Sequence, residues 1–140
     1  MDLNILKTSR GMRSNKYIHG ERNKNLCQDL LKNKVYYDWV ITTAFYSSIH
    51  LLEDKFLPAD INGSKCTNIS HVRKSYNLKG RHMAREKLIE NLAEPKISIK
   101  YKWLDDRSRY SRYTTYKVQA AEAHKAEQYL LDIFEYCQNN

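Results

Sequence analysis

The sequence predicts an all-α protein, built as an antiparallel bundle of four or five helices. Its 140 residues suit one domain with a single modest core. Only four glycines and two prolines are present, which favours long helices with few breaks over a loop-rich β fold. Apolar residues recur at spacings of three and four. We expect a loose N-terminal segment over residues 1–14 and one helical-bundle domain over residues 15–140.

The first half of the chain predicts two helices and a loop. Apolar residues among charged ones predict a helix over residues 15–33. Residues 35–57 give the strongest helical pattern, with one apolar stripe formed by Ile41, Phe45, Ile49, Leu52 and Phe56. Pro58 is expected to end that helix. Residues 58–69 contain the turn signal Asn62-Gly63 and are predicted to form a loop.

The second half predicts further helices separated by short breaks. Ser70 is expected to cap a helix that begins near His71, is broken near Gly80 and resumes to about residue 94. Pro95 suits the first turn of the next helix, whose face carries Ile97, Tyr101, Leu104 and Ser108. A last helix is expected over residues 116–138, with a stripe formed by Ala123, Ala126, Leu130, Ile133 and Cys137.

The formal net charge of +8 favours anionic partners such as RNA, DNA, nucleotides or acidic protein surfaces. A basic surface without a ligand remains an alternative. Cys27, Cys66 and Cys137 are odd in number and widely spaced, which favours reduced thiols in the cytoplasm over a disulfide framework or zinc site. Neither a metal nor another cofactor is predicted. No secretory signal is visible, and no apolar run reaches membrane-spanning length, so no membrane partner is expected.

Tyr46, His50 and Glu53 fall on one edge of the strongest helix, at spacings of four and three residues. They predict a polar pocket between helices, the place where helical bundles build their sites. The alternative is a structural histidine whose ring nitrogens are hydrogen-bonded to a neighbouring helix.

The segment SHVRKSY, residues 70–76, places His71, Arg73 and Lys74 at a predicted helix start. Free backbone N–H groups at a helix start favour an anion, and these side chains would add hydrogen-bond donors. We therefore predict a phosphate contact at Arg73 and Lys74. An exposed polar helix start without a ligand is an equally weighted alternative.

The segment DDRSRYSRY, residues 105–113, predicts a second phosphate contact. On a helix, Arg109 and Arg112 share one face, and Tyr110 and Tyr113 share the adjacent face. Guanidinium groups grip phosphates, and phenolic rings stack on bases, so these four residues are candidate nucleic-acid ligands. In the alternative, the tyrosines pack into the bundle and the arginines pair with carboxylates of other helices.

Three segments in this order resemble the HEPN-like superfamily of small helical bundles. They are Ala44-Phe45-Tyr46 followed by His50, then Ser70-His71 followed by Arg73, then Ser108-Arg109 followed by Arg112-Tyr113. The resemblance covers about residues 20–138. It implies a four- or five-helix bundle, often a homodimer, and relatives in toxin–antitoxin, antiviral or RNA-processing systems.

The resemblance also implies a chemistry. Active members are metal-independent ribonucleases that use an arginine followed four to six residues later by a histidine at a dimer interface. In such a site, histidine moves the proton of a 2′-hydroxyl, and arginine stabilises the charged phosphate. The candidate catalytic residues that the resemblance suggests here are His71, Arg73, Arg109 and Arg112, converging from two helices.

The leading hypothesis is an RNA- or nucleotide-binding HEPN-like protein, including a ribonuclease of a toxin–antitoxin or antiviral defence system. One alternative is a non-catalytic, dimerising interaction module that docks on a protein encoded nearby. In that case Tyr36, Tyr37 and Trp103 are candidate interface anchors. The other alternative is a phage or mobile-element protein that acts on host defence.

Overall fold

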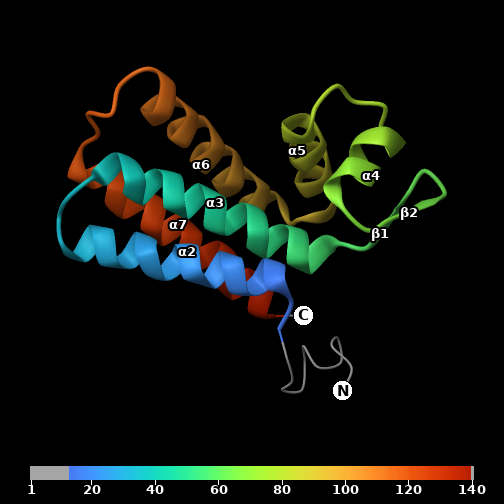
Figure 1. Cartoon of the computed structure of the whole chain (residues 1–140), viewed down its shortest axis with the longest axis horizontal. Helices are drawn as coiled ribbons and strands as arrows, with labels where there is room; N and C mark the ends of the chain where they lie inside the picture. Colours follow the sequence, from blue (N-terminus) through green and yellow to red (C-terminus); the bar gives the residue numbers. More distant parts are fainter. Residues whose placement is uncertain (1–12, 140) are drawn as a thin grey trace.

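The structure is a computed structural model that describes residues 13–139 (Figure 1). Residues 1–12 of the expected N-terminal segment, and residue 140, lie outside the described part. In chain order the elements are α2 (Asn15–Lys32), α3 (Tyr37–Phe56), β1 (Ala59–Ile61), β2 (Ser64–Cys66), α4 (Ile69–Ser75), α5 (Arg81–Leu92), α6 (Pro95–Tyr113) and α7 (Ala120–Gln138). The predicted all-α helical bundle is confirmed.

Four long helices, α2, α3, α6 and α7, form the bundle, and α3 contacts each of the other three. The chain reverses direction between α2 and α3 and again between α6 and α7 (Figure 1). Most residues of α3 are buried, because a helix with several neighbours has little surface left for solvent. Its buried residues include Val40, Ile41, Ala44, Leu51 and Leu52.

A small lobe lies at the end of the bundle where α3 finishes, and it consists of β1, β2, α4 and part of α5 (Figure 1). Its own apolar cluster is formed by Ile61, Cys66, Ile69, Val72, Ala84 and Leu88. The lobe falls partly in the region predicted as a loop. Strands of three residues are too short to show an alternating pattern, so the sequence indicated only their turn.

The two strands pair antiparallel, with Ala59 opposite Cys66 and Ile61 opposite Ser64. Asn62 and Gly63 connect them with φ angles of 50° and 83°. Two positive φ angles are what a tight two-residue hairpin turn requires, and asparagine followed by glycine tolerates them best. The predicted turn is therefore found.

Several predicted helix ends differ from the observed ones. Asn68, and not Ser70, caps α4, because the Asn68 side chain accepts a hydrogen bond from the His71 backbone N–H at 3.0 Å. Gly80 separates α4 from α5, and Pro95 is the first residue of α6, as expected. Ser14, predicted to lie in a loose segment, caps α2 and also hydrogen-bonds to Asp54.

The helices α2 and α3 approach each other most closely at Gly20. A Cβ atom at this position would lie 2.9 Å from Leu51 Cγ and 3.3 Å from His50 Cβ. The Gly20 carbonyl oxygen accepts a hydrogen bond from the Ser47 hydroxyl at 2.7 Å. A glycine and a serine therefore bring the two backbones together here, and this contact fixes the position of α3 against α2.

Candidate functional site

A pocket of about 430 Å³ lies between α3, α5 and α6. We call it the arginine pocket. Its lining residues are Phe45, Tyr46 and Ile49 from α3, His82 and Arg85 from α5, and Tyr101, Asp105, Arg109, Arg112 and Tyr113 from α6. The α6 residues share one face because they are spaced three and four apart.

Arg112 is anchored inside the pocket by a neutral partner. Its Nη1 donates a hydrogen bond to the hydroxyl of the buried Ser108, one helical turn earlier, at 3.0 Å. Its guanidinium carbon lies 5.5 Å from the ring centroid of Tyr46 and 5.4 Å from that of Tyr113. Among residues 13–139, no carboxylate forms an ion pair with Arg112. Its positive charge is therefore held in place but not neutralised.

Arg109, three residues earlier, is neutralised by a buried carboxylate. Asp105 is 2% exposed, and its Oδ1 accepts a hydrogen bond from Arg109 Nη2 at 3.1 Å. The other carboxylate oxygen lies 3.4 Å from Nε2 of His82 on α5. Burial raises the pKa of Asp105, and the nearby His82 and Arg109 oppose that rise. Asp105 thus holds both an arginine and a histidine at the pocket wall.

Arg85 is also neutralised, by a carboxylate of α3. Its Nε lies 2.5 Å from Oε2 of the buried Glu53, and the other oxygen of Glu53 lies 3.4 Å from the Lys16 ammonium on α2. Glu53 therefore joins three helices. A buried carboxylate needs such partners, since an uncompensated charge away from water is unfavourable by several kcal/mol.

Tyr101 lines the pocket with a buried side chain. Its hydroxyl is buried, and it has no hydrogen-bond partner within the part of the chain that the structure describes. Burial raises the pKa of this phenol, and the charge of Asp105 raises it further. Buried hydroxyls are normally hydrogen-bonded, so this unsatisfied group indicates a place for a polar atom from a ligand or water.

The pocket brings together four of the residues predicted from the sequence. Arg109, Arg112, Tyr113 and Tyr46 all line it. Tyr110 does not, because it lies on another side of α6, with the Arg107 guanidinium 4.7 Å from its ring centroid.

The three residues of the predicted polar pocket, Tyr46, His50 and Glu53, lie in three different environments. Tyr46 lines the arginine pocket, and Glu53 is buried in the ion pairs with Arg85 and Lys16. His50 faces α2, where its ring stacks on His19 with centroids 3.9 Å apart.

The predicted contact at the start of α4 is separate from the arginine pocket. His71 Nδ1 lies 3.1 Å from the Thr67 hydroxyl, and Arg73 donates a hydrogen bond to the Leu78 carbonyl at 3.2 Å. Lys74 is exposed on the same short helix. Helix α5 lies between α4 and α6 (Figure 1). His71 and Arg73 are not among the residues that line the pocket with Arg109 and Arg112, so the structure does not show the expected convergence.

His82 and Arg85 of α5 are among the pocket residues that the sequence interpretation missed, together with Tyr101 and Asp105 of α6. The two α5 residues lie in the first turns of that helix, directly after Gly80. The only available signal was a histidine and an arginine spaced three apart in RHMAR, residues 81–85. That pattern becomes informative only when α5 is known to pack against α6.

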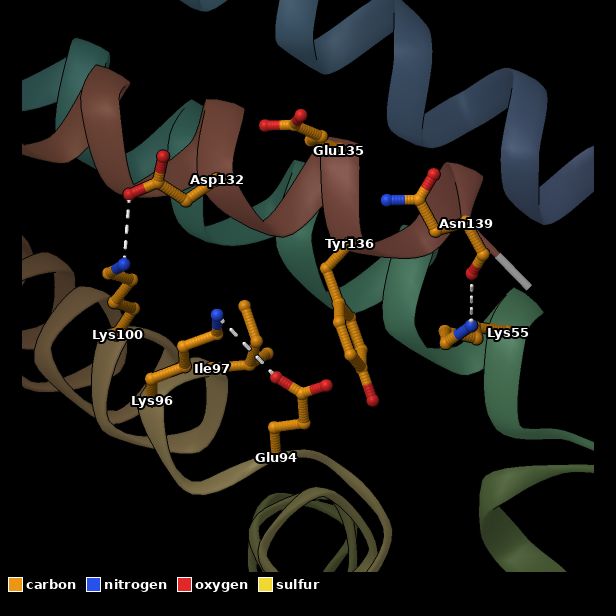
Figure 2. Close-up of a pocket in the computed structure, with 9 residues that line it drawn as sticks. All are labelled: Lys55, Glu94, Lys96, Ile97, Lys100, Asp132, Glu135, Tyr136 and Asn139. Atoms are coloured by element: carbon orange, nitrogen blue, oxygen red, sulfur yellow. Dashed lines mark hydrogen bonds and ion pairs between the residues drawn. The ribbon is translucent and has the colours of Figure 1, made fainter.

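A larger pocket of about 670 Å³ lies between the ends of α3, α6 and α7, and Figure 2 shows its lining. Its lysines already have partners: Lys100 reaches Asp132 at 3.0 Å, Lys96 reaches Glu94 at 3.7 Å, and Lys55 donates to the Asn139 carbonyl at 3.0 Å. Because positive and negative side chains alternate and pair here, this pocket is a weaker anion site than the arginine pocket.

The aromatic side chains proposed as interface anchors are exposed to different degrees. Tyr36 is 67% exposed, and the neighbouring Trp39 is 52% exposed. Together with Leu26 and Leu30 they line an apolar groove of about 300 Å³. Trp103 instead packs edge-on against Tyr129, with centroids 5.2 Å apart. The protein-interaction alternative therefore rests on Tyr36 and its neighbours, and Trp103 is a packing residue.

Within residues 13–139, no group of three or more histidines, cysteines, aspartates or glutamates is placed to hold a metal ion. In the same range, no helix is long and apolar enough to cross a membrane. No protein-family model, curated protein or solved structure matches this chain.

Proposed function

We propose that this protein is a HEPN-like helical bundle that binds nucleic acid or nucleotides through the arginine pocket. The observation that carries the proposal is Arg112, a half-buried guanidinium fixed by Ser108 and without a carboxylate partner among the described residues. A positive charge partly removed from water is stabilised by a counter-ion. Phosphate is a suitable one, because its oxygens accept the parallel N–H bonds of a guanidinium.

The surroundings of Arg112 favour a phosphate that carries bases. Tyr46 and Tyr113 come from different helices, are 38% and 78% exposed, and lie next to the guanidinium. Exposed aromatic rings beside a cationic group are the usual elements of single-strand binding, since bases stack on the rings while the cation holds the backbone. The net charge of +8 would speed the approach of such a ligand.

Replacement of Arg112 tests the proposal. We expect Arg112→Gln to weaken binding of a single-stranded RNA decamer about tenfold or more, and to reduce the slope of log affinity against log salt by about one. Fluorescence anisotropy over a salt series measures both quantities. The matched control is Arg22→Gln, which removes the same charge from an exposed position on α2. Equal losses in the two variants would mean that binding is non-specific attraction to a basic protein.

A second candidate function is metal-independent RNA cleavage, favoured by the contact between His82 and Arg109. Nη2 of Arg109 lies 3.0 Å from Nδ1 and 2.5 Å from Nε2 of His82, and the imidazole is partly exposed and lines the pocket. In this proposal His82 accepts the 2′-hydroxyl proton, and the 2′-oxygen attacks the adjacent phosphorus. The bond to the 5′-oxygen then breaks, and this oxygen takes the proton back from the His82 imidazolium, leaving a 2′,3′-cyclic phosphate and a 5′-hydroxyl, while the arginines stabilise the added charge.

The cleavage proposal predicts that His82→Gln abolishes product formation from RNA in buffer that contains a metal chelator. Substitution of the exposed His71 by glutamine, on the far side of α5, is the control and should leave the rate unchanged. Gel analysis of end-labelled RNA measures the rate. Cleavage that survives in the His82 variant would exclude this role for His82.

A further inference from the structure

We propose that Asp105 restricts the arginine pocket to singly charged phosphodiesters. The pocket would then accept an internal linkage of a nucleic-acid strand and disfavour the doubly charged phosphate of a free nucleotide. This inference rests on the proposed function and names the class of ligand that the same site selects. Asp105 would be a specificity-determining residue that does not itself hold the ligand.

The charges in the pocket are nearly balanced by its own side chains. Three guanidinium groups line it, those of Arg85, Arg109 and Arg112. Glu53 neutralises Arg85, and Asp105 neutralises Arg109. Within residues 13–139, Arg112 is the pocket arginine without a carboxylate partner. Of the three pocket guanidinium groups, the one at Arg112 is therefore left to pair with a ligand, which suits a ligand with one negative charge.

Phosphodiesters and phosphate monoesters differ in their negative charge at neutral pH. A phosphodiester within a strand carries one negative charge. A phosphate monoester has a second pKa near 6 and carries roughly −1.5 to −2 at pH 7. The additional charge of a monoester would have no free guanidinium to pair with, and it would face the carboxylate of Asp105. Like charges repel strongly where water is excluded, and Asp105 is 2% exposed.

Asp105 cannot easily lose its contacts with Arg109 and His82. A dianion could gain a second guanidinium only if Arg109 left the Asp105 carboxylate, to which it is bonded at 3.1 Å. The buried carboxylate would then keep only its contact with Nε2 of His82, at 3.4 Å. Removing one partner from a buried charge is strongly unfavourable. Arg109 is therefore committed to Asp105, and the spare charge stays at Arg112.

The aromatic rings give a separate reason to expect a nucleic-acid strand as the ligand. Tyr46 on α3 and Tyr113 on α6 both lie near the Arg112 guanidinium, at 5.5 and 5.4 Å from their centroids. An internal phosphodiester has a base on each side, so both rings can take part in stacking. A free nucleotide carries a single base and can use one ring only.

The experiment compares two ligands that differ by one charge: adenosine 5′-monophosphate and its methyl ester, which is a phosphodiester. Each is used at millimolar concentration to displace a fluorescently labelled RNA decamer from the full-length protein. We expect the methyl ester to displace the decamer about tenfold more effectively than the monophosphate, because like charges brought together disfavour the dianion. Equal displacement, or better displacement by the monophosphate, would overturn the inference without any variant.

The variants then assign the preference to one side chain. Asp105→Asn keeps the shape of the side chain and removes its charge, so we expect the preference for the methyl ester to fall to less than twofold. Asp106→Asn makes the same change at the adjacent, exposed residue of α6 and should keep the wild-type preference. Circular dichroism establishes that both variants fold. A folded Asp105→Asn protein that keeps the full preference would show that another group sets it.

The outcomes separate this inference from the proposed function. If the wild-type protein does not bind the decamer, or binds it equally well without Arg112, the proposed function fails. If binding of the decamer depends on Arg112 but neither mononucleotide is preferred, the function stands and the role of Asp105 is refuted. Displacement by neither mononucleotide would also refute it, since the methyl ester carries the charge that the pocket is inferred to select.

Discussion

Arg109 and Arg112 stand three residues apart on one helix and have opposite electrostatic surroundings. Arg109 is paired with a buried carboxylate, whereas Arg112 is hydrogen-bonded to a buried hydroxyl. In the sequence both are arginines preceded four residues earlier by a short polar residue, Asp105 or Ser108. The α6 side of the pocket could therefore be predicted from spacing alone, including which arginine has a carboxylate within one turn.

A second pair of residues couples stability to pH. The rings of His19 and His50 stack with centroids 3.9 Å apart and planes inclined by 20°. Burial and, to a smaller extent, the charge of His19 lower the pKa of His50 to about 4, while Glu53 opposes the shift. Because the folded protein favours the neutral imidazole, protons bind more readily to the unfolded chain.

The expected result is a loss of stability in acid. The contribution of His50 is fully present above its unfolded pKa of about 6.5 and is lost as the pH falls toward about 4. Urea unfolding at pH 7 and pH 4.5 measures it. We expect His50→Gln to lose less free energy of unfolding between these pH values than the wild type, while the exposed His124→Gln behaves as wild type. If the wild type and both variants lost the same free energy of unfolding, the sensitivity to acid would come from groups other than His50.

At the scale of the helices, α2 and α3 approach most closely through small residues that the sequence interpretation did not single out. Ser48 of α3 is buried, but it donates a hydrogen bond to the Ala44 carbonyl of its own helix at 2.9 Å, which satisfies the hydroxyl locally. The close contact uses Ser47 and Gly20, and a lone glycine in a helical pattern does not reveal what it faces.

This contact predicts an unusual effect of alanine. In most helices, glycine to alanine is stabilising by about 1 kcal/mol. At Gly20 the added Cβ would lie 2.9 Å from Leu51 Cγ and 3.3 Å from His50 Cβ, so α2 and α3 must separate. We expect Gly20→Ala to lower the free energy of unfolding by about 1–2 kcal/mol in urea unfolding, because overpacking outweighs helix propensity.

The control for this prediction is Gly80→Ala. Gly80 caps α5, and a Cβ there would meet no atom within 4 Å. Its φ of −147° is allowed for any residue. We expect a change of no more than about 0.5 kcal/mol. A stabilised Gly20→Ala protein would mean that the two helices adjust at no cost.

The ends of a helix could be predicted where apolar spacing determines them. They could not be predicted where side-chain hydrogen bonds to the backbone replace the helical ones. The helices α2 and α3 begin and end within two residues of the predicted limits of 15–33 and 35–57. The last helix begins at Ala120 and not at Tyr116, because the Lys117 N–H is hydrogen-bonded to the Thr115 hydroxyl at 3.1 Å. Such side-chain bonds to the backbone replace the first turn of a helix.

At the scale of the whole molecule, the part of the arginine pocket that α5 supplies could not be predicted. The spacing of Arg109 and Arg112 is a property of one helix, but the placement of His82 and Arg85 depends on how the lobe docks on the bundle. That docking is specified by apolar contacts between segments far apart in the sequence. Periodicity along one helix carries no information about them.

Helix α5 belongs to both apolar clusters. Ile89 is part of the bundle core, whereas Ala84 and Leu88 belong to the cluster of the lobe. The orientation of α5 is therefore set jointly by the bundle and by the hairpin with α4. None of the buried residues of the lobe cluster lines the arginine pocket, yet they determine where His82 and Arg85 stand. Substitutions in the hairpin can therefore change the positions of His82 and Arg85 in the pocket without altering the four long helices.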